Sequence, residues 1–264
     1  MLNKLMSNYF EASIHFSNLA YYSEKWVSQK LKFMKDIDEY EMESLKFLKK
    51  YNLRPKINNK KDLGLPNILY CLHEDVLFLS FPGIRTNQDK KNCLDFEYIE
   101  NKYLDCQVHR GFQNIFLKLK DEVKLIIDIY LESKNVKEIY FVGHSLGGAI
   151  AKINALYFSI LFEEVKISSI TFASPIIGDK KFYIDLEKKL NFSFTLCCQK
   201  DFLIRIPMWR GCYDHNKYMI DGKNMSKYKN RCNLYLYNFV TFNTDTHKLL
   251  HYMNFLKEKN FNLI

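Results

Sequence analysis

Apolar residues along the middle of the chain recur with two spacings, short continuous runs and helical intervals, and the two alternate. The continuous runs predict buried strands at 68–72, 76–81, 138–142, 167–172 and 192–198, with a further strand at 234–242. Helical spacing predicts helices over 112–134, 149–158, 180–190 and 246–257. The polar triplet His73-Glu74-Asp75 between the first two strands indicates a hairpin. Alternating strands and helices predict an α/β fold, in which helices flank a mostly parallel central sheet.

The first part of the chain has a different pattern, because residues 8–52 contain no Pro or Gly and are rich in helix formers. We expect one or two amphipathic helices there that pack on the rest of the protein, since acidic residues interleaved throughout argue against a membrane-surface helix. Their expected buried contacts are Phe10, Ile14, Trp26, Leu31, Phe33, Met34, Leu45 and Leu48. We expect a single domain over 1–264, with a helical N-terminal extension at 1–62 and a catalytic core at 63–264.

The most informative motif is Gly143-His144-Ser145-Leu146-Gly147, which joins a predicted strand to a predicted helix. In this strand–turn–helix context, Gly-x-Ser-x-Gly holds a serine hydroxyl above the end of a sheet. Glycines on both sides allow close backbone approach, and the helix points its free amides at the reacting centre. We therefore expect Ser145 to be a nucleophile.

A serine hydroxyl needs a base and an orienting acid, and in α/β-hydrolase sheets the acid follows the serine and precedes the histidine. Asp201 comes directly after the strand predicted at 192–198, which is where such an acid belongs. Asp179 and Asp185 are alternatives, but one lies at a predicted helix start and the other within that helix. Asp179 is better explained as a helix N-terminal charge.

Three histidines follow Asp201 and are candidates for the base: His215, His247 and His251. His247 lies at the start of the last predicted helix, where a loop can reach the strand ends. His251 is one turn later and would face the same side. Structural roles are expected for the remaining histidines, which are His15, His73, His109 and His144.

Charge and cysteine content narrow the class of protein. The net charge of +9 is spread along the chain without an Arg-rich block or nucleic-acid motif, so we expect no nucleic acid partner. Peripheral contact with an anionic membrane remains open. The seven cysteines form no Cys-x-x-Cys pair, which predicts neither a metal site nor a disulfide framework.

The same features bear on location. We expect a reducing compartment from the odd cysteine number. The N-terminal residues lack the continuous apolar core of a signal peptide, and no segment is long and apolar enough to span a membrane. The prediction is a cytoplasmic protein, or one peripheral to an intracellular membrane. The oligomeric state is left open.

Five blocks in order resemble the class 3 (fungal-type) triacylglycerol lipases, a branch of the α/β-hydrolases, over about residues 65–255. The blocks are 80–84, 108–112, 141–151, 171–178 and 201–207. The resemblance implies that the acid begins the last block, which supports Asp201. It also implies a base near the C-terminus followed by a tyrosine, which fits His247 and Tyr252. Tyr213-Asp214-His215 matches a structural Tyr-x-His of the family, which makes His215 a poor candidate.

The resemblance further implies an oxyanion hole made by the backbone amides of Leu146 and Ile84. This chain has Pro82-Gly83-Ile84 where such lipases commonly have Arg-Gly-Thr or Arg-Gly-Ser. Isoleucine supplies an N–H but no hydroxyl, so we expect the departure to affect the level of activity more than the reaction type. A Phe-Pro-Gly sequence is also similar to lipase-like plant signalling proteins, some of which act as scaffolds.

The resulting hypothesis is a serine carboxylic-ester hydrolase that cleaves acylglycerol or phospholipid esters through Ser145, Asp201 and His247, with no cofactor and no metal. A lipase-like scaffold with weak or no catalysis is the alternative, and a thioesterase or acyltransferase would use the same residues. A lid is expected between Ile84 and Val108. Because that segment is largely polar, we predict weak interfacial activation and a preference for modest acyl esters or phospholipids.

Overall fold

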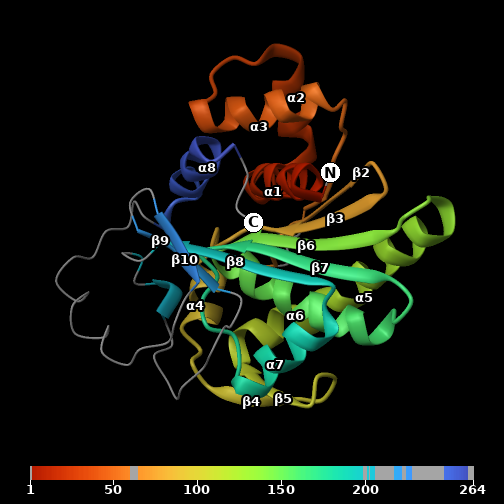
Figure 1. Cartoon of the computed structure of the whole chain (residues 1–264), viewed down its shortest axis with the longest axis vertical. Coiled ribbons are helices and arrows are strands. Elements are labelled where there is room, and N and C mark those ends of the chain that lie inside the picture. The colour runs from red at the N-terminus through yellow and green to blue at the C-terminus, as the bar shows by residue number, and fades with distance from the viewer. Residues whose placement is uncertain are drawn as a thin grey trace.

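An eight-stranded sheet forms the centre of the computed structural model (Figure 1), which describes residues 2–59, 65–198, 201, 203–205, 217–221, 224–227 and 247–260. The strand order is β1-β2-β3-β6-β7-β8-β9-β10. The strands from β3 to β9 in this order run parallel, and β1, β2 and β10 are antiparallel additions at the edges. The predicted α/β fold with a mostly parallel sheet is therefore confirmed. The bounds are β1 Lys56–Asn58, β2 Ile68–His73, β3 Val76–Phe81, β6 Glu138–His144, β7 Lys166–Phe172, β8 Phe192–Cys198, β9 Lys217–Asp221 and β10 Asn224–Lys227.

The five predicted strands that fall within the described residues, 68–72, 76–81, 138–142, 167–172 and 192–198, are all present, and β2 and β3 form the expected hairpin. Five short strands were not predicted: β1, β9, β10 and a separate pair, β4 Tyr98–Asn101 and β5 Cys106–His109. These strands are too short and too polar to give a hydrophobic period. The strand predicted at 234–242 lies outside the described residues.

Helices α5 Arg110–Ser133, α6 Leu146–Leu161 and α7 Lys180–Lys189 cover one face of the sheet (Figure 1). We call this face the internal-helix side, because each helix comes from the middle of the chain. Its core is largely apolar, with Phe116, Phe141 and Phe158 fully buried, and it also encloses Lys152 and Asn154 of α6. The nearly complete burial of α6 explains its almost continuous apolar sequence.

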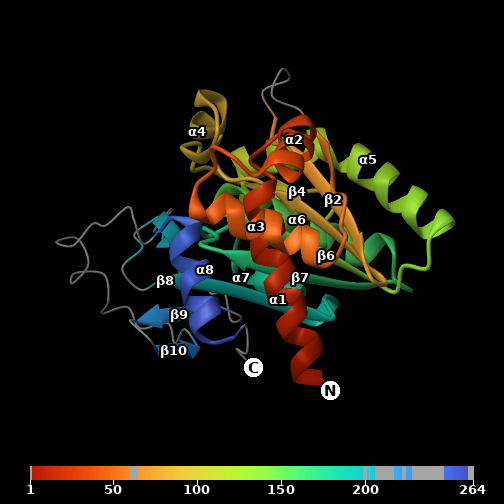
Figure 2. The same ribbon diagram turned by 90° about the horizontal axis from the view of Figure 1, so that it is seen from above.

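The opposite face is covered by helices from the two ends of the chain, and we call it the terminal-helix side (Figure 2). Helix α1 Leu2–Leu19 lies on the sheet beside α8 Leu249–Glu258, and α3 Glu39–Lys50 stacks on α1. Helix α2 Glu24–Phe33 completes this layer. A second apolar cluster fills the space between these helices and the sheet.

The N-terminal segment forms three helices rather than the one or two predicted. The chain breaks after α2 because Met34 adopts a left-handed conformation (φ 40°), and α3 then begins at an Asp38 capping box. Of the expected core residues, Phe10, Ile14, Leu45 and Leu48 are buried, and Trp26, Leu31 and Met34 pack partly buried against them. Phe33 is 72% exposed, so its predicted burial is wrong.

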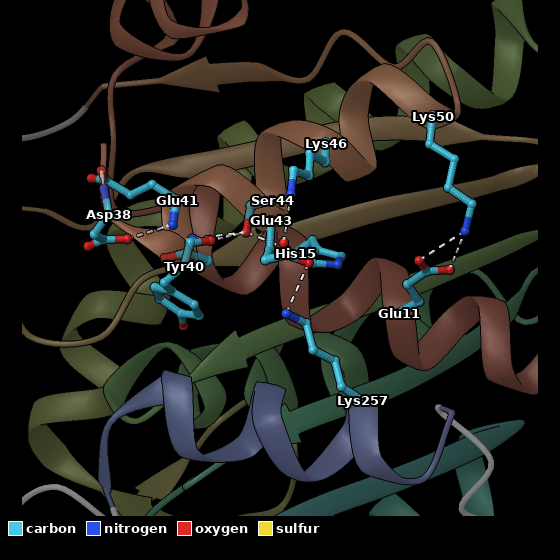
Figure 3. A network of polar contacts seen from close by, with 11 residues as sticks. Glu11, His15, Asp38, Tyr40, Glu41, Glu43, Ser44, Lys46, Lys50 and Lys257 are labelled. Carbon is cyan, nitrogen blue, oxygen red and sulfur yellow. Dashed lines mark hydrogen bonds and ion pairs between the residues drawn. The ribbon is translucent and has the colours of Figure 1, made fainter. Parts of the chain in front are cut away.

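Polar contacts tie α1, α3 and α8 of this layer together (Figure 3). Lys50 of α3 pairs with Glu11 of α1 at 3.1 Å, and Lys257 of α8 pairs with Glu43 of α3 at 2.9 Å. His15 Nδ1 and Ser44 Oγ lie 3.1 Å apart in the buried α1–α3 contact. Exposed ion pairs of this kind add little stability, so the apolar cluster supplies most of the packing energy.

We propose that residues 1–264 form one domain, with 1–62 as an N-terminal extension and 63–264 as the core that it covers. Phe10 and Leu45 of the extension belong to the same apolar cluster as Phe78 and Tyr140 of the sheet. The extension also contributes β1, which pairs with β2. Such continuous burial argues against an independently moving unit.

Candidate active site

Ser145 occupies a sharp turn between β6 and α6. Its backbone has φ 55° and ψ −125°, a sparsely populated conformation for a residue with a side chain. A Cβ atom on Gly143 would clash with the carbonyl oxygen of Gly147, and one on Gly147 would clash with the carbonyl oxygen of Phe81. The two glycines therefore allow α6 to begin directly against the ends of β6 and β3, and the turn projects Ser145 from the sheet.

The structure brings Ser145, His247 and Asp201 together. His247 Nε2 lies 2.8 Å from Ser145 Oγ, and His247 Nδ1 lies 2.6 Å from Asp201 Oδ2. Because a carboxylate only accepts hydrogen bonds, the partners assign the ring proton to Nδ1 and leave Nε2 facing the serine hydroxyl as an acceptor. This is the arrangement in which an imidazole can take a proton from serine.

Asp201 is held by contacts from β8 and α8. It is 1% exposed, and its Oδ1 accepts a hydrogen bond from the Leu203 N–H at 3.0 Å. The Tyr252 hydroxyl donates to Asp201 Oδ2 at 3.4 Å and accepts from the Cys198 N–H at 3.0 Å. These partners fix the carboxylate toward His247.

The rival acids lie elsewhere. Asp179 caps α7 by accepting from the Phe182 N–H at 2.9 Å, which confirms its predicted role at a helix start. Asp185 pairs with Lys181 on the surface of the same helix at 2.8 Å.

The other histidines fit structural roles. His251 lies one turn after His247, and its buried Nε2 has no hydrogen-bond partner. Burial lowers the His251 pKa. His109 accepts from the Phe112 N–H at the start of α5, and burial lowers its pKa to about 4. His215 lies outside the described residues.

Both residues expected to supply oxyanion amides line a small cavity with the serine and histidine. The cavity has a volume of about 70 Å³ and is lined by Ile84, Cys93, Phe112, Ser145, Leu146, Ala173, Pro175, Leu203 and His247. Leu146 is the first residue of α6, where backbone amides have no carbonyl of their own helix to bind. The positive end of the α6 dipole therefore faces the serine.

A short helix, α4 Asn87–Cys93, occupies the segment where a lid was expected. Thr86 and Asp89 form a capping box at its start, and Cys93 at its end lines the cavity beside Ser145. The exposed residues of α4 are polar, while Leu94 and Phe96 just beyond it are exposed apolar residues.

Sequence reasoning missed one group of contacts. His144, assigned only a structural role as the variable residue of the motif, contacts both His247 and the N-terminal extension. Its Nε2 lies 2.7 Å from the carbonyl oxygen of His247, and its Nδ1 lies 2.8 Å from the Tyr21 hydroxyl. No local signal marks Tyr21, because the two partners are 123 positions apart in sequence.

The parallel sheet, the strained serine turn and the flanking helices define an α/β-hydrolase. The sequence profile of the lipase (class 3) family matches residues 78–211, and the chain belongs to this family. The match covers most of β3, the serine turn and Asp201.

Relatives and solved structures agree with this assignment. The chain is 32% identical over 84 residues to a secreted mono- and diacylglycerol lipase of Malassezia restricta, covering 32% of this chain and 28% of that protein. A secreted mono- and diacylglycerol lipase of Malassezia globosa is 24% identical over 119 residues, covering 45% of this chain and 39% of that protein. The chain thus spans well under half the length of either relative. The Rhizomucor miehei triacylglyceride lipase structure has a TM-score of 0.61 at 17% identity, with 81% of this chain and 79% of that one aligned.

The expected cytoplasmic or intracellular-membrane location is contradicted, since these curated relatives are secreted lipases. The expectation combined the odd cysteine number with an N-terminal sequence that lacks the apolar core of a signal peptide, and the structural setting of two cysteines weakens the first argument. Burial raises the pKa of the Cys71 and Cys106 thiols to about 12, so both stay protonated and unreactive as small hydrophobic side chains. Such thiols do not require a reducing compartment. Among the described residues, no helix has the length and hydrophobicity to cross a membrane.

Proposed function

We propose that the protein is a serine carboxylic-ester hydrolase that acts on acylglycerol or phospholipid esters. The observation that supports this most strongly is the pair of contacts linking Ser145 Oγ to His247 Nε2 at 2.8 Å and His247 Nδ1 to Asp201 at 2.6 Å. Acylglycerols are the first substrates to test, because the matched relatives are named mono- and diacylglycerol lipases.

In the proposed reaction, Ser145 Oγ attacks the ester carbonyl while His247 Nε2 takes the hydroxyl proton. Asp201 keeps the imidazole in the required tautomer and stabilises the imidazolium that forms. The backbone amides of Leu146 and Ile84 would stabilise the oxyanion. His247 then protonates the leaving alcohol, and water activated by the same ring hydrolyses the acyl-enzyme. These steps require no cofactor or metal.

A fluorophosphonate probe tests the nucleophile directly. We expect covalent labelling of the wild-type protein, loss of labelling in Ser145→Ala, and unchanged labelling in Ser133→Ala, whose exposed serine lies at the end of α5. Absence of labelling in folded wild-type protein would instead favour the lipase-like scaffold. Hydrolysis of p-nitrophenyl esters, acylglycerols and labelled phospholipids, with Ser145→Ala as the blank, then defines the substrate.

The small cavity also bears on how substrate enters. Its volume of about 70 Å³ is far below the roughly 300–1,000 Å³ of ordinary ligand pockets, so a fatty acyl chain requires its walls to move. Helix α4 is the proposed lid, because Cys93 at its end forms part of the wall. Its exposed residues are polar, so contact with lipid gives little energy for opening, and we expect weak interfacial activation. The initial rate should rise smoothly with tributyrin concentration, and a sharp jump at the solubility limit would contradict this expectation.

A further inference from the structure

A chain of hydrogen bonds connects the N-terminal extension to the backbone of the proposed base. Tyr21 follows α1, and its hydroxyl lies 2.8 Å from His144 Nδ1. His144 Nε2 lies 2.7 Å from the carbonyl oxygen of His247. The extension is therefore linked through the His144 side chain to the backbone of His247, whose ring faces Ser145.

The direction of each hydrogen bond follows from its partners. A carbonyl oxygen only accepts, so His144 Nε2 carries the proton. Burial lowers the His144 pKa to about 3, which keeps the ring neutral, and Nδ1 is then an acceptor for the Tyr21 hydroxyl. Burial also raises the Tyr21 pKa, so the hydroxyl keeps its proton. These two hydrogen bonds therefore keep the same donors and acceptors at neutral pH.

The same hydroxyl reaches the segment that precedes the second oxyanion amide. The Tyr21 oxygen packs directly against Gly83, where an added Cβ would clash with it. Gly83 is followed directly by Ile84. One hydroxyl therefore contacts both the loop that carries Ile84 and, through His144, the backbone of His247.

Tyr21 and His144 also border a cavity of about 540 Å³, whose walls include Asn18, Tyr40, Leu249 and Leu250. His144 is nevertheless buried, and its ring lies against those of His247 and Tyr252. The two hydrogen bonds add a fixed direction to this packing.

We propose that Tyr21 and His144 are positioning residues that hold the base His247 and the Ile84 loop in reactive geometry. This inference depends on the proposed function, because it concerns the same hydrolytic site. It makes the N-terminal extension part of the catalytic apparatus rather than only a cover for the sheet.

Tyr21→Phe tests the proposal, with Tyr22→Phe as its matched control. Tyr22 is the neighbouring residue and also borders the larger cavity, but its hydroxyl bonds to Glu41 rather than to the active site. Losing one buried hydrogen bond while leaving its partners unpaired should lower kcat and the probe-labelling rate by about 10- to 100-fold in Tyr21→Phe. We expect little change in KM and a folded protein by circular dichroism, and we expect Tyr22→Phe to match the wild type.

Two substitutions of His144 test its contacts with the His247 carbonyl and the Tyr21 hydroxyl one at a time. In His144→Gln the amide nitrogen can occupy the place of Nε2 and donate to the His247 carbonyl, whereas in His144→Asn the amide can only replace Nδ1. We expect His144→Gln to retain more kcat than His144→Asn at equal thermal stability. A merely structural role for His144 would make kcat follow stability instead. The effects of Tyr21→Phe and His144→Gln should also be less than additive, because they interrupt one chain.

The outcomes separate this inference from the proposed function. If the wild type is labelled and Tyr21→Phe reacts as fast, the inference is overturned and the proposed function stands. Equal kcat in His144→Gln and His144→Asn would overturn it as well. If folded wild-type protein is not labelled at all, the proposed function fails and the inference that depends on it falls too.

Discussion

The two sides of the central sheet differ in how the chain builds them. On the internal-helix side, each of α5, α6 and α7 directly precedes or follows a strand that it helps to cover, and the buried residues are mostly apolar, although Lys152 and Asn154 of α6 are also buried. On the terminal-helix side, α1 and α8 come from opposite ends of the chain and lie side by side. Buried polar residues such as His15, Asn18 and Ser44 connect these helices.

The two sides also contribute differently to the candidate active site. The internal-helix side provides the serine turn and the start of α6. The terminal-helix side provides His247 just before α8, and also Tyr252 and Tyr21, which hold the residues around it. The site therefore lies where the two sides meet. Away from the serine turn, substitutions in the core of the internal-helix side should mainly change stability, whereas core substitutions on the terminal-helix side should change stability and turnover together.

The largest expected effect is on turnover in Asp201→Asn. The amide keeps the shape of the side chain but no longer fixes the His247 tautomer, so kcat should fall by about 10⁴-fold, as when other serine hydrolases lose this charge. Steady-state kinetics on a p-nitrophenyl ester measures the loss. Asp185→Asn, at the exposed pair with Lys181 on α7, is the control and should leave kcat unchanged. A loss of less than tenfold in Asp201→Asn would remove Asp201 from the proposed triad.

Matched core truncations on the two sides test the comparison itself. Phe16 of α1 and Phe158 of α6 are both fully buried and in contact with other aromatic rings. Replacement by Ala should lower the free energy of unfolding by about 3–5 kcal/mol in each case. Denaturant unfolding measures this loss.

The two truncations should differ in their effect on turnover. Helix α1 is followed directly by the segment that contains Tyr21, whereas α6 is buried along most of its length. Below the unfolding temperature, kcat should fall more in Phe16→Ala than in Phe158→Ala. Equal losses of kcat at equal stability would show that the two sides do not differ in their link to the site.

The residues predicted from sequence are those whose signals lie within one continuous segment. The strand before Ser145, the glycines around it and the helix after it are adjacent in sequence, so the pattern predicted β6, the turn and α6 together. Asp201 was the predicted acid because it follows Ser145 in sequence and comes directly after a predicted strand. The base required the family resemblance, since position in the sequence alone left His215, His247 and His251 open.

The features that sequence did not predict depend on contacts between distant segments or on local backbone breaks. Tyr21 meets His144 only after α1 has packed on the sheet. The separation of α2 from α3 depends on the left-handed Met34, a conformation that methionine does not signal. Phe33 is exposed because it is the last residue of α2 and lies two positions after the partly buried Leu31, near the opposite side of the helix.

A smaller effect is expected from two buried tyrosine hydroxyls, one on each side of the sheet. Tyr252 accepts from the Cys198 N–H at 3.0 Å, and Tyr183 of α7 accepts from the Ile177 N–H at 2.9 Å. Replacement of either by Phe leaves a buried amide unpaired and should destabilise the protein by about 1–3 kcal/mol. Only Tyr252 also donates to Asp201, so kcat should fall in Tyr252→Phe and not in Tyr183→Phe. Thermal unfolding measures the loss of stability, and steady-state kinetics measures kcat. An equal kcat in the two variants would show that the Tyr252 hydroxyl does not contribute to catalysis.

The smallest effect is a dependence of stability on pH, and it should appear on both sides. Burial lowers the pKa of His15 on α1 to about 3 and that of His109 at the start of α5 to about 4. Below its ordinary pKa of about 6.5, each ring takes up a proton in the unfolded chain but not in the folded protein. The stability that each neutral histidine contributes is therefore complete above pH 6.5 and decreases as the pH falls toward its folded-state pKa. Between pH 7.5 and 5.5 the free energy of unfolding should drop by about 1 kcal/mol for each histidine. Urea unfolding at the two pH values should show a correspondingly smaller drop in His15→Asn and in His109→Asn. If only His15→Asn reduces the drop, acid sensitivity belongs to the terminal-helix side alone, and the two sides differ in stability as well as in their contribution to the site.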